Sequence, residues 1–190
     1  MTPKRLWHTI MLNVRNGYER ANYLRNHRLF HRIGKKVYIQ GRILPLYSEL
    51  ISLGDNVIIS SHVSFITHSY IHAMLNSAAD LSIVDKLQEQ VGCIEVGDNV
   101  FIGANTTILS NVRIGSNVIV AAGSIITKDV PSNSIVGGVP AKVIEPLDEY
   151  LEKLGKRERY PAELAPKKQS ISNELADYLW KQFTEERKQV

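Results

Sequence analysis

The sequence predicts a mainly β chain that winds as a parallel β-helix, with an α-helical segment at each end. Two observations support this prediction: a six-residue repeat through the middle of the chain and a turn-forming residue in every repeat. The repeat runs without a slip from Val96 to Pro131, as VGDNVF, IGANTT, ILSNVR, IGSNVI, VAAGSI and ITKDVP. Short strands joined by tight turns explain such a period, whereas a plain helix or an antiparallel hairpin does not.

Two positions of the hexad carry the pattern. The first is always aliphatic and β-branched, which suits a buried, pleated surface: Val96, Ile102, Ile108, Ile114, Val120 and Ile126. The fourth holds residue types that tolerate a left-handed backbone: Asn99, Asn105, Asn111, Asn117, Gly123 and Asp129. Three such sides make a triangular coil of about 18 residues, and coils stack about 4.8 Å apart with the first position inward.

The same pattern begins earlier in the chain and is then interrupted. LGDNVI, ISSHVS and FITHSY extend it over residues 53–70, and a weaker start occurs over residues 33–44. The step from Phe65 to Val96 is not a multiple of six, so no whole number of hexads covers it. Residues 69–93 are therefore predicted to leave the solenoid as an excursion, and a loop of this length on a rigid scaffold is where function is expected.

The flanking segments are predicted to be helical. This divides the chain into an N-terminal helical segment (1–32), a β-helix (33–145) and a C-terminal helical extension (146–190). One helix is expected from Pro3 to about Phe30, because apolar residues recur three or four apart there: Leu6, Ile10, Val14, Tyr18 and Ala21. A short helix is expected over residues 148–156, and another is opened by Ser172.

Composition and charge narrow the function classes. The net charge is +4, and residues 1–40 carry nine Lys or Arg against Glu19 alone. We interpret this basic zone as a contact for an anionic acceptor or as peripheral contact with a membrane surface, or as solvated surface, and expect no nucleic acid partner. Cys93 is the single cysteine, so an intrachain disulfide is excluded. Without a signal-peptide pattern or a transmembrane-length apolar run, a cytoplasmic location is expected.

His68 stands where the repeat is interrupted, at the fourth position of its hexad. Two roles are open on spacing alone. It could be catalytic, at the mouth of the excursion, or structural, because His is itself enriched in left-handed turns and His62 occupies the same position one hexad earlier. His72, inside the excursion, is a second candidate for the catalytic residue.

The hexads, the ITH at 66–68, the excursion and the run AAGSIITKDVPSNSIVGGVPAKVI at 121–144 resemble the hexapeptide-repeat acyltransferases. The galactoside, maltose and xenobiotic acetyltransferases are the most similar group, and the resemblance covers roughly residues 33–145. It implies a left-handed parallel β-helix, a homotrimer, and active sites between neighbouring subunits. It also implies acetyl-CoA as co-substrate, no metal, and His68 as the catalytic base.

The resemblance further implies which residues contact acetyl-CoA. They are Phe101, where many members have Trp, and Ala104, Ala122, Thr127, Lys128 and Lys142. It assigns the Ala104 amide as a donor to the oxyanion of the reaction. Glu145 stands where a basic residue is common, which puts the family's way of holding the CoA phosphates in doubt. No acceptor-contacting residue is carried over, because the early coils diverge from the family.

The implied reaction is transfer of an acetyl group to a hydroxyl of a sugar or a related small acceptor. An imidazole, with an unperturbed pKa of about 6.5, can take the hydroxyl proton during attack on the thioester. A covalent route through Cys93 is the less favoured mechanism, because Cys93 is expected among apolar neighbours where the excursion returns. An amino sugar, an antibiotic or serine stays open as an alternative acceptor. Two other classes stay open: a non-catalytic trimeric scaffold, and a γ-carbonic-anhydrase-like metal enzyme in which His62, His68 and His72 would be the ligands.

Overall fold

A computed structural model describes residues 2–78, 85–157, 159–166 and 170–188 of the chain. The chain divides into two compact units, Met1–Tyr150 and Leu151–Val190. The first unit contains the predicted β-helix together with the helices that precede it. The domain boundaries expected at residues 32 and 145 stay a prediction.

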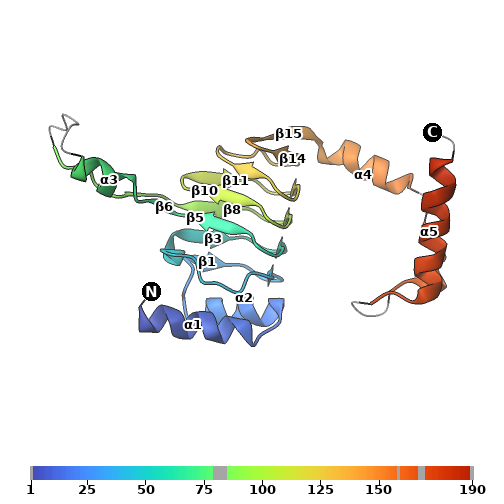
Figure 1. The fold of residues 1–190 in the computed structure, drawn as a ribbon, viewed down its shortest axis with the longest axis horizontal. Helices are drawn as coiled ribbons and strands as arrows, with labels where there is room; N and C mark the ends of the chain where they lie inside the picture. The colour runs from blue at the N-terminus through green and yellow to red at the C-terminus, as the bar shows by residue number, and fades with distance from the viewer. Residues whose placement is uncertain (1, 79–84, 158, 167–169, 189–190) are drawn as a thin grey trace. The chain divides into compact units, whose positions relative to one another are not determined.

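The solenoid has three faces of stacked parallel strands, and each complete coil contributes one strand to each face (Figure 1). The first coil has no strand on the third face. The first face comprises β1 (Arg32–Ile33), β3 (Ile51–Leu53), β8 (Ile94–Val96) and β11 (Val112–Ile114). The second comprises β2 (Tyr38–Ile39), β4 (Val57–Ile59), β9 (Val100–Ile102), β12 (Val118–Val120) and β14 (Ser134–Gly138). The third comprises β5 (Ser64–Ile66), β10 (Thr107–Leu109) and β13 (Ile125–Ile126). The prediction of a parallel β-helix is confirmed.

Strand register confirms both the coil length and the place of the excursion. Arg113 pairs with Glu95, at a sequence separation of 18, which is one coil of three hexads. Between β3 and β8 the separation is much larger, because Ile51 pairs with Ile94 across the inserted segment 69–93. The two ends of the solenoid depart from 18: the separation between stacked positions is 20 across the first coil and 16 across the last.

The predicted core positions are buried. All six first-position residues from Val96 to Ile126 are at most 2% exposed. The fifth position of the hexad, which the sequence analysis did not single out, is buried as well: Val100, Thr106, Val112, Val118, Ser124 and Val130. Each coil therefore presents two inward side chains per face, and the interior is filled by aliphatic and small hydroxyl residues.

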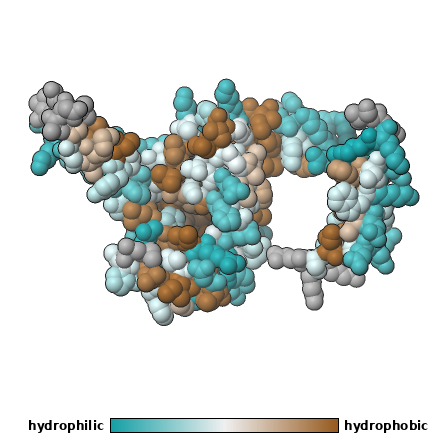
Figure 2. All heavy atoms as spheres, in the orientation of Figure 1, coloured by the Kyte–Doolittle hydropathy of each residue, from teal (hydrophilic) through white to brown (hydrophobic). Residues whose placement is uncertain are grey.

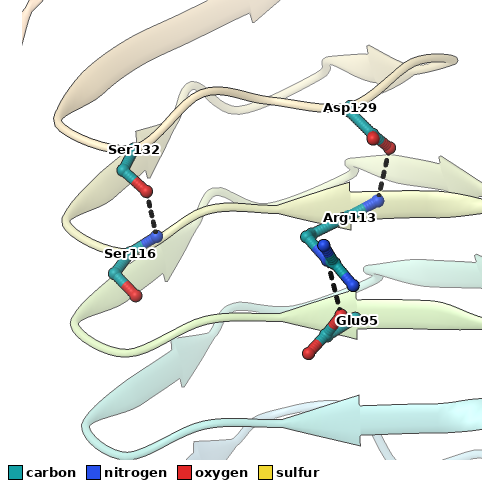
Figure 3. A network of polar contacts seen from close by, with 5 residues as sticks. All are labelled: Glu95, Arg113, Ser116, Asp129 and Ser132. Atoms are coloured by element: carbon teal, nitrogen blue, oxygen red, sulfur yellow. Dashed lines mark hydrogen bonds and ion pairs between the residues drawn. The ribbon is translucent and has the colours of Figure 1, made fainter.

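The fourth position adopts the left-handed backbone at Asn99, Asn105, Asn111, Asn117 and Gly123, as predicted, with φ between 55° and 74°. The prediction is wrong for Asp129, which has no positive φ; its carboxylate instead accepts the Arg113 N–H at 2.8 Å (Figure 3). The shortened last coil explains the difference, because its 16-residue spacing places Asp129 over Arg113 and not over Asn111. Asn side chains at one corner bond to one another between coils, in the order Asn56, Asn99, Asn117 and Asn133, at 2.9 Å each.

The N-terminal segment forms two helices, α1 (Pro3–Asn13) and α2 (Gly17–Asn26), and not the single helix expected over 3–30. The break occurs because Asn16 and Glu19 form a capping box that starts α2. Gly17 permits close packing there, since a Cβ would lie 2.3 Å from the Tyr38 ring.

The break also changes which face of the N-terminal segment is buried. Leu12, Ala21 and Leu24 join the core, whereas Leu6, Ile10 and Val14 of the predicted stripe are exposed. Figure 2 shows hydrophobic residues at the surface in the region of α1. In α1 the predicted apolar stripe is therefore not the buried face, whereas Ala21 of the stripe is buried in α2.

The excursion is a two-stranded ribbon that carries a short helix. β6 (His68–Ser69) pairs antiparallel with β7 (Gln90–Val91), and α3 (Ile71–Ser77) follows β6. Asn76 of α3 exchanges two hydrogen bonds with the backbone of Leu87, at 2.8 and 2.9 Å, which ties the outward and return segments together. Residues 79–84 lie outside the described residues.

The solenoid ends in a hairpin, because β15 (Ala141–Pro146) pairs antiparallel with β14. α4 (Leu147–Gly155) follows, then a 3₁₀ turn (Ala162–Leu164) and α5 (Asn173–Arg187) in the second unit. Ser172 caps α5 through its side chain, as the sequence predicts. None of the helices in the described ranges is long and apolar enough to cross a membrane.

Candidate active site

His68 is in an extended strand and not in a turn. It forms β6 and pairs with Val91, whereas the positive φ of 56° belongs to His62, one hexad earlier. The structural role considered for His68, a left-handed turn residue, is therefore wrong, and it applies to His62. The backbone leaves the solenoid at His68, so its side chain is free of the repeat that constrains the other fourth-position residues.

The His68 ring lies edge-on to Tyr47, with ring centroids 5.3 Å apart and planes at 78°. Tyr47 lies in a left-handed conformation, with φ 49°, before the 3₁₀ turn Ser48–Leu50. Its hydroxyl donates to the Glu89 carboxylate at 3.2 Å, and that bond raises the pKa of Tyr47. Glu89 comes from the return segment of the excursion, so these contacts join His68, the first coil and the excursion.

The two ring nitrogens of His68 differ. Nδ1 is enclosed and has no hydrogen-bond partner among the described residues. Nε2 also bonds to no described group but is not enclosed, so it is the nitrogen open to a substrate. Nδ1 of His72 is enclosed in the same way, so the enclosure of a ring nitrogen does not by itself single out His68.

Thr67 fixes the mouth of the excursion. Its side chain is fully buried, and its hydroxyl donates to the Leu46 carbonyl at 2.7 Å. Its own carbonyl accepts the Gly92 N–H at 2.8 Å, at the point where the chain returns to the solenoid. Both ends of the excursion and the segment leading to Tyr47 are thus tied at the residue before His68.

A cavity of about 660 Å³ opens beside this mouth. Its lining comes from Arg5 of α1, residues 40–45 and residues 61–66. It stops two residues before His68 on one side and two residues before Tyr47 on the other. Two residues span at most about 7 Å, so a small acceptor can occupy the cavity and still place a hydroxyl at His68.

Side chains at alternate positions hold the segment 40–46 that forms one wall of this cavity. β5 is the edge strand of the third face, because residues 40–46 of the first coil form no strand beside it. The carbonyls of this segment therefore accept from side chains. Four carbonyls each accept from a side chain of another element, at 2.7–3.3 Å: Gln40 from Arg20, Arg42 from Asn13, Leu44 from Arg5, and Leu46 from Thr67. These hydrogen bonds fix the cavity wall in a segment where the strand pairing of the hexapeptide repeat is absent.

Four arginines of the basic N-terminal zone, Arg5, Arg15, Arg20 and Arg25, have internal acceptors. Arg20 is 5% exposed and also donates to the Leu12 and Ile39 carbonyls. Arg25 donates to the Ile33 and Gly34 carbonyls, and Arg15 donates to Met11 and lies over the Tyr23 ring. Much of this positive charge therefore packs the helices onto the first coil. Peripheral membrane contact by this segment stays a prediction.

The residues expected to contact acetyl-CoA fall into two groups. Ala104 and Ala122 lie at the corner between the second and third faces, in adjacent coils, and Phe101 lies just before them on the second face. Lys142 pairs with Gly137, which packs on Ala121 at the same corner. Thr127 and Lys128 follow β13 at the opposite end of the third face, two strands above β5 and the mouth of the excursion.

The structure therefore brings His68 towards Thr127 and Lys128, and not towards Ala104, Ala122, Phe101 and Lys142. The two corners are separated by the third face, about 20 Å of extended chain. Lys128 and Lys142 are exposed and form no ion pair with a described residue. The Ala104 N–H has no acceptor among the described residues, so it is available to a ligand.

The other candidate residues do not join this arrangement. His72 lies on α3 beside Tyr70, with ring centroids 5.1 Å apart. Cys93 is exposed, which differs from the apolar surroundings expected for it. Within the described ranges no three His, Cys, Asp or Glu side chains are grouped to hold a metal, so His62, His68 and His72 do not converge.

Sequence reasoning missed Tyr47, Glu89 and the wall 40–46. Tyr47 and Glu89 belong to no hexad, the wall only overlaps the weak start of the repeat, and no motif marks any of them. Their contacts join segments 20 to 42 residues apart. The weak start of the repeat at residues 33–44 was the one available indication that this side of the first coil is irregular.

Comparison with known proteins gives matches over the solenoid. The profile of the family described as "Bacterial transferase hexapeptide (six repeats)" matches residues 94–128. "Putative acetyltransferase YvoF" of Bacillus subtilis (strain 168) is 35% identical over 138 residues, 71% of this chain and 72% of that protein. Protein CapG of Staphylococcus aureus is 38% identical over 141 residues, 73% of each. The crystal structure of a maltose O-acetyltransferase from Clostridium difficile 630 is similar with a TM-score of 0.52, at 25% identity over 75% of this chain and 86% of that one.

Proposed function

The chain belongs to the hexapeptide-repeat acyltransferases, and on that basis we propose that it moves an acetyl group from acetyl-CoA to a hydroxyl of a sugar or a related small acceptor. His68 is the general base. The observation that carries this proposal is the setting of His68: Nε2 is open, Nδ1 is enclosed, and a cavity of about 660 Å³ begins two residues away. The maltose acceptor in the name of a similar structure supports a sugar.

The chemistry needs one proton acceptor and one oxyanion donor. Nε2 of His68 takes the hydroxyl proton as the acceptor oxygen attacks the thioester carbonyl carbon. The Ala104 N–H, which has no acceptor among the described residues, is suited to the tetrahedral oxyanion. Collapse of the intermediate breaks the C–S bond, and the imidazolium returns its proton to the CoA thiolate. The thioester is already activated, so no acyl-enzyme on Cys93 is required.

The site is proposed to form between subunits of a homotrimer with left-handed coils. The two groups of acetyl-CoA residues lie at different corners of one prism, so one site that uses both needs a second copy of the chain. A neighbouring subunit would also supply the partner that His68 Nδ1 lacks. Lys128 of one subunit and Lys142 of another would then both be near the phosphates of CoA.

The test is replacement of His68 by Ala. Turnover, followed as thiol release from acetyl-CoA with a panel of sugars and nucleotide sugars, should fall by about 10²- to 10⁴-fold. Because His68 lies in extended backbone, Ala adds no left-handed strain, so the oligomer mass by light scattering and the affinity for CoA should stay unchanged. The matched control is His72→Ala, which should keep most activity. Loss of turnover in His72→Ala but not in His68→Ala would contradict the assignment of the base.

A further inference from the structure

The cavity beside His68 has a basic lining without a compensating acid. Arg5, Arg42 and His62 supply its ionisable side chains. The rest of the described lining is neutral, from Gln40 and the two serines to Pro45 and the aliphatic residues, and contains no carboxylate. A concave site lined by charge of one sign concentrates ligands of the opposite sign.

The two guanidinium groups keep donors available for a ligand. Arg5 uses Nε and one terminal nitrogen on the Leu44 carbonyl, which leaves part of its five-donor fork unused. Arg42 is exposed, and its guanidinium has no hydrogen bond or ion pair with a described residue. The Arg42 guanidinium is therefore available to a ligand. Its backbone is fixed, because Asn13 donates to the Arg42 carbonyl.

A third guanidinium adds to the positive field. Arg20 is buried next to the same segment, with carbonyl acceptors only. Burial, and then the charge of Arg42, lower the pKa of Arg20. Tyr38 and Glu19 act in the opposite direction, each by less than Arg42. A bound anion would reduce the remaining repulsion between the two guanidinium groups.

We propose that this cavity binds an anionic group of the acceptor, so that the acceptor is a sugar acid or a sugar phosphate. The inference rests on the proposed function, which it deepens by naming the substrate class. Arg42 would grip a carboxylate or phosphate through its planar fork, with Arg5 and His62 beside it. The two residues between the cavity lining and His68 span at most about 7 Å, which suits a sugar ring whose acidic substituent lies in the cavity and whose hydroxyl meets Nε2.

The experiment compares three acceptors that differ in one substituent: a hexose, the corresponding hexuronic acid, and the hexose 6-phosphate. In the wild-type protein we expect kcat/KM to be at least about tenfold higher for one or both acids than for the hexose. Arg42→Gln should reduce kcat/KM for the acids by about 10- to 100-fold, the effect of one charge-assisted contact, and change the hexose value by less than about threefold. Lys35→Gln, which removes an exposed charge at another corner, is the control and should change none of them. Preference for only one acid identifies the group as carboxylate or phosphate.

Binding without acetyl-CoA separates this inference from the proposed function. Inorganic phosphate and the hexuronic acid are titrated calorimetrically into the wild-type protein and into Arg42→Gln. Binding that is lost in Arg42→Gln, with no acetyl transfer to any acceptor, would keep the anion site and refute the function. Acetyl transfer that favours the hexose, or that falls equally for all three acceptors in Arg42→Gln, would keep the function and overturn the anion site. No binding and no transfer would overturn both.

Discussion

Thr67→Val tests whether the hydroxyl that ties the excursion to the first coil also positions His68. Val has nearly the shape of Thr, so the change removes the 2.7 Å bond to the Leu46 carbonyl and little else. That carbonyl is left without its donor, at a cost of about 1–3 kcal/mol. For a chain of this size the cost lowers the melting temperature by about 2 to 12 °C. The Leu46 carbonyl is then no longer fixed, and the next residue is Tyr47, whose ring contacts His68.

The assay for Thr67→Val is kcat at saturating acetyl-CoA and acceptor, together with thermal unfolding. We expect kcat to fall about 3- to 30-fold, because a misplaced base lowers the rate without removing the proton acceptor. Ser134→Ala is the matched control: a buried hydroxyl loses an equally short bond, to the Pro131 carbonyl, in the last coil. It should lose stability and keep kcat. Destabilisation of Thr67→Val with unchanged kcat would refute the positioning argument.

Two further predictions concern acetyl-CoA and pH. Lys142→Glu should raise KM for acetyl-CoA by about tenfold or more with little change in kcat, because Lys142 is exposed and proposed to meet the phosphates; an unchanged KM at low salt would make it an ordinary surface residue. Burial, then His27 and Lys4, lower the pKa of His8, so the unfolded chain binds a proton there more readily. Its stabilising contribution is complete well above the unfolded value of 6.5 and is lost as the pH falls below it. Unfolding temperatures from pH 8 to 5 should therefore drop less in His8→Gln than in the wild type, and identical slopes would contradict this.

The repeat could be predicted because its causes are local. Each hexad contains its own inward aliphatic residue and its own turn residue, so coil length and core followed from the sequence, and so did the place of the excursion. The exceptions arise where local sequence no longer decides. Asp129 lies in the shortened last coil, and His68 lies where the antiparallel pairing with Val91 replaces the turn. A residue's place in the hexad does not reveal either change.

The helical segment at the N-terminus illustrates a second kind of miss. Apolar periodicity predicts one helix where the structure has two, because it takes no account of the capping box at Asn16, which starts a new helix. The basic residues were interpreted by their net charge, whereas the structure shows Arg20 and Arg25 donating to backbone carbonyls. A count of charges does not distinguish an arginine in solvent from one that donates to backbone carbonyls inside the fold.

The internal role of these basic residues has its physical origin in the first coil. Its third side has no strand below β5, so the carbonyls of residues 40–46 must find donors elsewhere. Arg5, Asn13 and Arg20 from the helices supply them, and Thr67 supplies the last, next to His68. The residues that the family resemblance implies for acetyl-CoA lie on the later coils and on the hairpin that ends the solenoid. The irregular first coil forms one wall of the cavity beside His68, and its geometry depends on long-range side-chain bonds. Arg42 lies in that wall with no described partner for its guanidinium, and it is the residue that we propose binds the anionic group of the acceptor.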